Sequence, residues 1–215
     1  MTILPYVLEL FTFILFVPLI SLIINFILFL KPLKVLKNAI GLLFAPGIAI
    51  HEASHLFFCK ILGTKIVDIT YFKPYVCGFQ GYVKTEEIES FLKAFLIGIA
   101  PAIVNSLLVY LVFKLYVLNF LNLFLTAYLM FSLIIGARPS IQDILTAFSV
   151  AAKYPSRFLS ELLALVSPLA SIFTYHYFQT LLGLNLGITG EVALTVLLFG
   201  PILYILFHRE EGGRY

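Results

Sequence analysis

Uninterrupted apolar runs, each long enough to cross a lipid bilayer, recur along almost the whole of this chain. A helix needs about 20 mostly apolar residues to span the hydrocarbon core. Such runs cover six segments, at roughly residues 4–30, 39–59, 91–113, 118–136, 158–182 and 190–207. Their apolar residues do not alternate with polar ones, as the strands of a membrane β-barrel require. The sequence therefore predicts an all-α transmembrane fold of about six membrane-spanning helices, forming a single domain over residues 1–215.

The composition indicates the same class of protein. Hydrophobic residues make up 61% of the 215 residues and charged residues 12%, with a mean hydropathy of +1.06. Soluble domains carry about 25% charged residues. The net charge of +3 is small and scattered, so no nucleic-acid partner is expected. The lipid bilayer is the expected surrounding.

The connection between the second and third predicted spans, residues 60–90, differs in character from a simple turn. Its stretches Ile66–Phe72 and Val76–Val83 are rich in β-branched and aromatic residues, and Lys73 and Pro74 separate them. This pattern predicts a small membrane-associated β-hairpin after the second span.

Basic residues near the span ends predict the orientation. One face would hold the 60–90 loop, the 137–157 loop and both termini, with ten basic residues: Lys60, Lys65, Lys73, Lys84, Lys93, Arg138, Lys153, Arg157, Arg209 and Arg214. The other face would hold four: Lys31, Lys34, Lys37 and Lys114. Cytoplasmic loops carry the excess of lysine and arginine. We therefore expect a multi-pass protein of the cell membrane with both termini in the cytosol.

The second predicted span contains a His-Glu-x-x-His motif, His51-Glu52-Ala53-Ser54-His55. On a helix, positions four apart lie about 40° apart around the axis, so His51 and His55 can bind one metal ion. Glu52, on the neighbouring face, can take a proton from a water molecule and deliver it to a leaving amine. Each ionisable group near the bilayer centre costs at least about 2.5 kcal/mol. Three of them together predict a catalytic zinc site more strongly than a packing role.

Catalytic zinc usually takes three protein ligands and leaves one position for water. Asp143 is the best candidate for the third ligand because it follows the fourth span, on the face predicted for the two histidines. The alternative is that Asp143 caps the helix that follows it. Glu161 is the second choice. The weaker competitors are His176, Glu191 and the acidic run Glu86, Glu87 and Glu89.

Two features near the motif have two interpretations each. Asn105, within the third span, can hydrogen-bond an extended substrate or a developing oxyanion, or it can bond a neighbouring helix. Pro46 and Gly47 precede His51 by about one turn. They can bend the helix so that water or substrate approaches, or they can reflect ordinary packing.

The pattern resembles the site-2 protease family of intramembrane zinc metalloproteases. The matching pieces are the motif at residues 51–55, Pro101, Asn105 and Asp143. The resemblance implies that the two histidines and the aspartate bind Zn²⁺, that Glu52 is the catalytic base, and that Asn105 takes part in catalysis. It further implies that the chain, as a divergent member, hydrolyses peptide bonds of transmembrane protein substrates.

Two other functions fit the same residues. A zinc or divalent-cation transporter would use His51, His55 and Asp143 as a transit site, although it has no need of a base at Glu52. A membrane protease of another family with the same motif would act on soluble or lipidated substrates and take a glutamate as third ligand. Metal flux would identify the first, and separate substitution of Asp143 and Glu161 the second.

Overall fold

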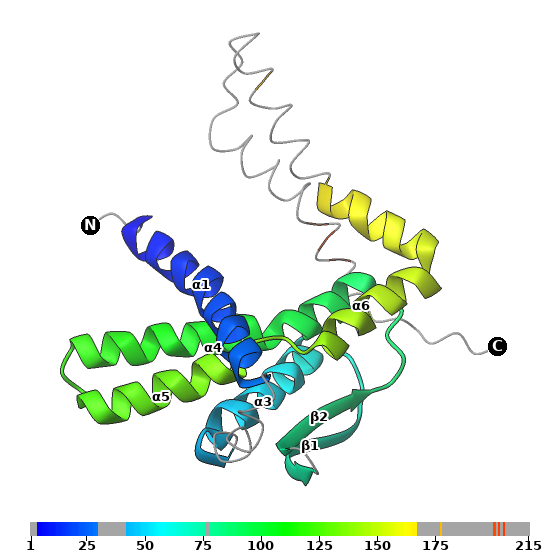
Figure 1. Ribbon diagram of the computed structural model, residues 1–215. Coiled ribbons are helices and arrows are strands. Elements are labelled where there is room, and N and C mark those ends of the chain that lie inside the picture. Colours follow the sequence, from blue (N-terminus) through cyan, green and yellow to red (C-terminus); the bar gives the residue numbers. More distant parts are fainter. Residues whose placement is uncertain are drawn as a thin grey trace. The chain divides into compact units, whose positions relative to one another are not determined.

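The computed structural model describes residues 4–29, 42–75 and 78–166, together with residues 177, 200, 202 and 204. Within these residues the chain is mostly helical, with one small sheet (Figure 1). The sixth predicted span, most of the fifth beyond residue 166, His176 and Glu191 lie outside the described residues. The chain divides into two compact units, residues 1–87 with 95–146, and residues 88–94 with 147–215.

Three described segments are long and apolar enough to cross a membrane: Leu4–Ile27, Phe91–Val117 and Leu123–Lys153. They contain α1 (Leu4–Phe29), α4 (Phe91–Val117) and the pair α5 (Leu123–Gly136) and α6 (Ile141–Lys153). These helices correspond to the first, third and fourth predicted spans. The fourth begins at residue 123 instead of 118 because Asn122 caps it, its side chain accepting the Leu125 N–H at 2.8 Å.

The second predicted span corresponds to a shorter helix, α3 (Ala45–Ile61), of 17 residues. At 1.5 Å per residue it is about 25 Å long, less than the hydrocarbon thickness of about 30 Å. Pro46 lies in its first turn, where the missing N–H would have no helical partner anyway. Pro46 therefore lies where α3 starts, directly after a turn at Phe44.

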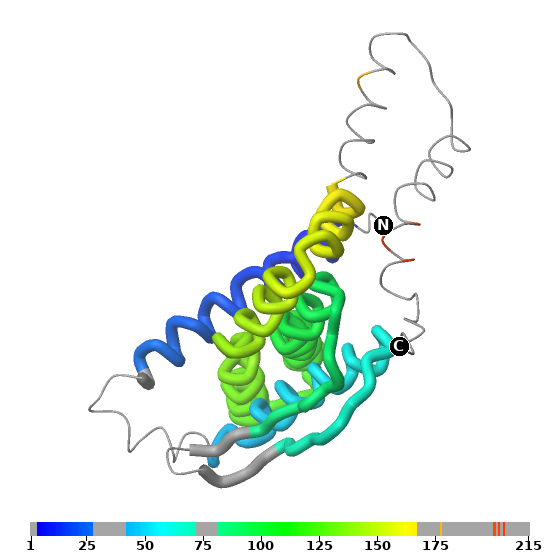
Figure 2. The backbone as a smooth tube through the Cα atoms, turned by 90° about the vertical axis from the view of Figure 1, so that its right-hand side faces the viewer, coloured from blue at the N-terminus to red at the C-terminus, as the bar shows by residue number. Residues whose placement is uncertain are grey.

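The hairpin predicted after this helix is confirmed. Strands β1 (Ile66–Tyr75) and β2 (Gly78–Thr85) pair antiparallel, with Ile66 opposite Thr85 and Ile69 opposite Val83. Both strands contact α3, and α3 also packs against α5 (Figure 1; Figure 2). The helix that carries the histidine motif thus lies between α5 and the hairpin.

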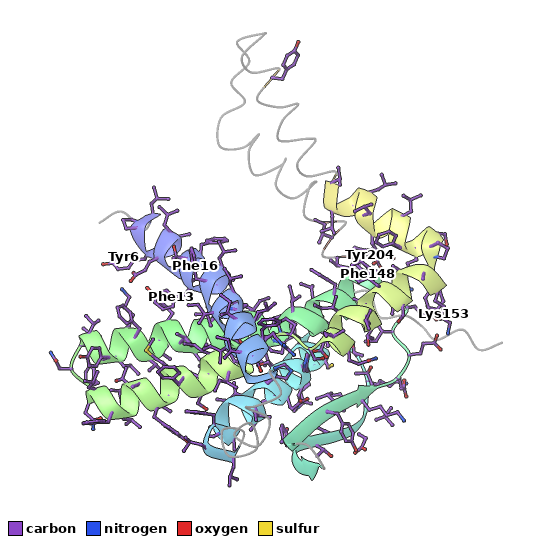
Figure 3. The ribbon with its side chains drawn as sticks, in the orientation of Figure 1. Tyr6, Phe13, Phe16, Phe148, Lys153 and Tyr204 are labelled. Atoms are coloured by element: carbon purple, nitrogen blue, oxygen red, sulfur yellow. The ribbon has the colours of Figure 1, made fainter. Side chains whose placement is uncertain are left out.

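Side chains of α1 contact the C-terminal half of α4. Lys114, near the end of α4, forms an ion pair with Glu9 at 2.7 Å. Phe13 of α1, labelled in Figure 3, packs edge-on against Tyr110. One turn farther along α1, Val17 joins a core cluster with residues of α4 and α5. The hairpin leads into the first turn of α4. The N-terminal end of α1 lies near the last turn of α4.

Candidate metal centre

The imidazoles of His51 and His55 face each other from consecutive turns of α3, with their Nε2 atoms 3.2 Å apart. The carboxylate of Asp143, in the first turn of α6, lies beside them. Its Oδ2 is 3.5 Å from His55 Nε2 and 3.9 Å from His51 Nε2. The structure therefore brings together the three side chains that the sequence predicts as metal ligands, with their ligand atoms all within 4.8 Å of one another.

Backbone carbonyls determine which nitrogen of each ring faces this cluster. His51 Nδ1 lies 2.8 Å from the Gly136 carbonyl oxygen, and His55 Nδ1 lies 2.7 Å from that of Ile97. A carbonyl can only accept, so both Nδ1–H groups donate, and each neutral ring presents a lone pair at Nε2. Two lone pairs and a carboxylate oxygen cannot satisfy one another while both rings are neutral. A proton on one Nε2 or a metal cation among them can, and ligating histidines in metalloproteins are held in this same way.

The donor set fits zinc. Zn–N bonds of about 2.0–2.1 Å in a tetrahedron place ligand atoms about 3.3–3.4 Å apart. The separation of 3.2 Å between the two Nε2 atoms matches this value, and the 3.5 Å between His55 and Asp143 is close to it, whereas the 3.9 Å between His51 and Asp143 is longer. Two imidazoles and one carboxylate suit zinc and other first-row transition metals, whereas calcium and magnesium prefer all-oxygen sites. Three protein ligands leave one coordination position open for water or substrate.

Asp143 is fixed by the start of α6. Its Oδ2 accepts the Ser140 N–H at 2.7 Å, and Ser140 Oγ accepts the Asp143 N–H at 3.1 Å. This reciprocal arrangement is a capping box, which satisfies two backbone donors at a helix N-terminus. The two interpretations of Asp143 therefore hold together, since the cap directs the carboxylate toward the histidines.

Two glycines allow α3 and α5 to touch backbone to backbone beside His51. A Cβ added at Gly47 would overlap the Ser132 carbonyl oxygen, and one added at Gly136 would overlap the Gly47 carbonyl oxygen. The Gly47 N–H donates to Ser132 Oγ at 2.8 Å. Small residues give such close helix contacts in membrane proteins. Because the helices are this close, the carbonyl of Gly136 reaches the ring of His51.

Asn105 of α4 is fully buried next to this contact. Its Nδ2 donates to the Pro101 carbonyl at 3.0 Å and to the Gly136 carbonyl at 3.4 Å. Both amide hydrogens are therefore used on backbone oxygens, and no donor remains for an oxyanion. Its Oδ1 is buried without a partner among the described residues. This geometry favours the interhelical interpretation, with Asn105 sharing the acceptor that holds His51.

Glu52 is buried on α3 beneath the hairpin. A Cβ added at Gly81 of β2 would overlap its side chain, so the missing side chain at residue 81 makes room for the carboxyl group. Sequence reasoning gave packing as one interpretation of Gly47 and missed the roles of Gly81 and Gly136. Their signal was present, because glycine inside a helix or strand marks a close approach of other atoms.

Glu161, the second choice for the third ligand, has other partners. It is 1% exposed, accepts the Leu92 N–H at 2.8 Å at the start of α4, and pairs with Arg157 Nε at 3.3 Å. In the acidic run before α4, Glu86 pairs with Lys65 at 3.2 Å and Glu89 with Arg157 at 3.1 Å. These carboxylates face hydrogen-bond donors, so their contacts are those of structural residues and not of metal ligands.

Comparison with known proteins identifies no relative. No protein-family model, curated protein or solved structure matches this chain. A functional assignment therefore depends on the geometry of the chain's own residues.

Proposed function

We propose that this chain is a multi-pass membrane zinc metalloprotease that hydrolyses peptide bonds of membrane-embedded protein substrates. The main support is the convergence of His51 Nε2, His55 Nε2 and Asp143 Oδ2, with both Nδ1–H groups donated to backbone carbonyls. Zn²⁺ bound by these three residues would supply a Lewis acid that activates water and polarises the scissile carbonyl. The resemblance to site-2 proteases belongs to this proposal.

In this proposal Glu52 moves the proton. It lies next to His51 on the same helix, and neither its sequence position nor its contacts give it a ligand role. Its carboxylate accepts a proton from the attacking water and delivers it to the leaving amine. Burial beneath Gly81 supports this role, because it shields the carboxyl group from bulk water.

Asn105 acts in this proposal as a positioning residue. It donates to the carbonyl oxygen of Gly136, which also accepts the Nδ1–H of His51. By holding that carbonyl, Asn105 fixes the orientation of the His51 ring and keeps its Nε2 directed at the metal. This role replaces the expected contact with an oxyanion.

The proposed topology has about six membrane-spanning helices, of which the three long apolar helices are part. The basic residues of the hairpin and of the loop after α5 favour the cytosol for the face that carries the hairpin.

The decisive experiment compares Glu52→Gln with the wild type in lipid nanodiscs. The variant keeps the size of the side chain, so bound zinc should stay near one per chain, while cleavage of a model transmembrane substrate should be lost. Glu86→Gln removes an exposed carboxyl group paired with Lys65 and should leave both zinc and cleavage unchanged. Full activity in Glu52→Gln would exclude Glu52 as the base, and absence of stoichiometric zinc from the wild type would overturn the proposal.

A transport assay distinguishes the alternative function. Proteoliposomes that contain the wild-type chain should show no zinc flux above empty vesicles. Sustained flux that persists in Glu52→Gln would favour a transporter, because a transit site needs the ligands but not the base.

A further inference from the structure

An apolar groove lies between α1 and the loop that joins α5 to α6. It has a volume of about 410 Å³, and its lining includes Leu19, Leu22, Arg138, Pro139, Ile141 and Ile144. Leu19 and Leu22 come from the middle of α1, and both are about half exposed. The groove is therefore open to the surroundings of the protein, and all but one of these side chains are apolar.

Arg138 is the one charged residue in this lining, and it has no hydrogen bond or ion pair within the described part of the chain. The other arginine described there, Arg157, is paired with Glu89 and Glu161. A guanidinium group stays charged at any physiological pH. In apolar surroundings such a charge requires an anionic partner.

The start of α6 continues the apolar wall. Ile141, Ile144 and Leu145 are 69%, 42% and 55% exposed, and their spacing of three and four residues places them on one side of the helix. A helix with such an exposed apolar side lies in the membrane interface, near the level of the lipid headgroups. Arg138, three residues before this stripe, is then within reach of headgroup phosphates.

We propose that this groove binds one acyl chain of an anionic phospholipid and that Arg138 binds its phosphate. The chemistry of the site matches both parts of such a molecule, since its walls are apolar and its only charge is positive. A guanidinium can hold a phosphate through two parallel N–H···O hydrogen bonds. The proposal does not depend on protease activity. The lipid would lie against the segment from residue 138 to residue 144, which carries Asp143.

Native mass spectrometry of the full chain in mild detergent tests the proposal. The protein is incubated with equal amounts of dioleoylphosphatidylglycerol and dioleoylphosphatidylcholine. The wild type should retain the phosphatidylglycerol, and Arg138→Gln should retain about fivefold less of it. Lys84→Gln removes an exposed cation from β2 and should change nothing.

A second pair of variants tests the groove without changing charge. Leu22→Trp places a large side chain in the groove and should lower retention of phosphatidylglycerol, whereas Leu15→Trp alters an exposed position of α1 outside the lining and should not. Equal retention by the wild type, Arg138→Gln and Leu22→Trp would overturn the proposal. So would a wild-type dimer without lipid that Leu22→Trp converts to monomer, because a second copy of the chain would then fill the groove.

Discussion

Asp143 and Glu161 are both carboxylates removed from water in a chain with few charges, yet their partners differ in kind. Glu161 faces a backbone N–H and a guanidinium group, both donors, so its charge is satisfied within the protein. Asp143 accepts one N–H from Ser140 and otherwise faces the Nε2 atoms of two imidazoles, which offer lone pairs when the rings are neutral. The hydrogen-bonding capacity of the neighbours, more than burial, separates a candidate metal ligand from a structural carboxylate.

The largest expected effect comes from Asp143→Ala. Loss of a direct ligand should lower zinc affinity by more than about 100-fold. That factor is the upper range for residues that hydrogen-bond a ligand without touching the metal. Glu161→Ala should leave zinc affinity within about twofold, because its contacts are to Leu92 and Arg157. Competition with a chromophoric zinc chelator measures both. Zinc loss in Glu161→Ala with retention in Asp143→Ala would reverse the assignment of the third ligand.

For stability the order of the two positions should reverse. Substitution of Glu161 should cost more stability than substitution of Asp143. Glu161→Ala leaves the Leu92 N–H and the Arg157 guanidinium without their acceptor, which should cost about 3 kcal/mol. Glu161→Gln keeps an acceptor for Leu92 and should cost less. Hydrogen exchange of the Leu92 amide reports this loss directly. Unchanged protection of that amide in Glu161→Ala would show that the cap contributes little.

Gly136→Ala tests whether the metal site depends on backbone packing. The added Cβ would overlap the Gly47 carbonyl, so α3 and α5 must separate, at a cost of about 1–3 kcal/mol. Zinc affinity should fall too, since the Gly136 carbonyl holds His51. Gly63→Ala is the control, because Gly63 has a φ of +67° and open space around it. That variant should cost about 1 kcal/mol and leave zinc binding unchanged. Equal zinc affinity in both variants would separate the metal site from the helix contact.

The smallest expected effect concerns Asn105. Asn105→Leu removes the donor to the Gly136 carbonyl and should weaken zinc binding about tenfold, at the low end for outer partners. The absorption spectrum of the cobalt-substituted protein should shift, which loss of stability alone would not cause. Ser106→Ala alters the next residue, equally buried and bonded within its own helix, and should do neither. A wild-type cobalt spectrum in Asn105→Leu would contradict the positioning role.

The local part of the site was predictable from the sequence. Two histidines four residues apart on a helix must lie on one side, so their meeting follows from helix geometry alone. Asp143 was found by its position after a span. The partners of Glu161, Gly47 and Asn105 were not predictable, because each contact joins distant parts of the chain. The Leu92–Glu161 hydrogen bond, for example, crosses 69 residues.

For the fold as well, local features were predictable from the sequence and contacts between distant segments were not. Composition and β-branched residues predicted the long apolar helices and a hairpin close to its observed bounds. Counting basic residues predicted an orientation but not how α1 packs, because it treats each lysine as an isolated charge. Lys114 is neutralised by Glu9 of a helix more than a hundred residues earlier in sequence. Such pairing depends on how helices pack.

The contact between Gly47 and Gly136 restricts how a polypeptide could enter the centre. Where two main chains meet without intervening side chains, neither helix can rock or slide without collision, so α3 and α5 move as one piece. The seam between them is closed to a substrate. A substrate of the proposed protease would have to enter elsewhere, for example by displacement of the hairpin or of α1, which pack against α3 and α5.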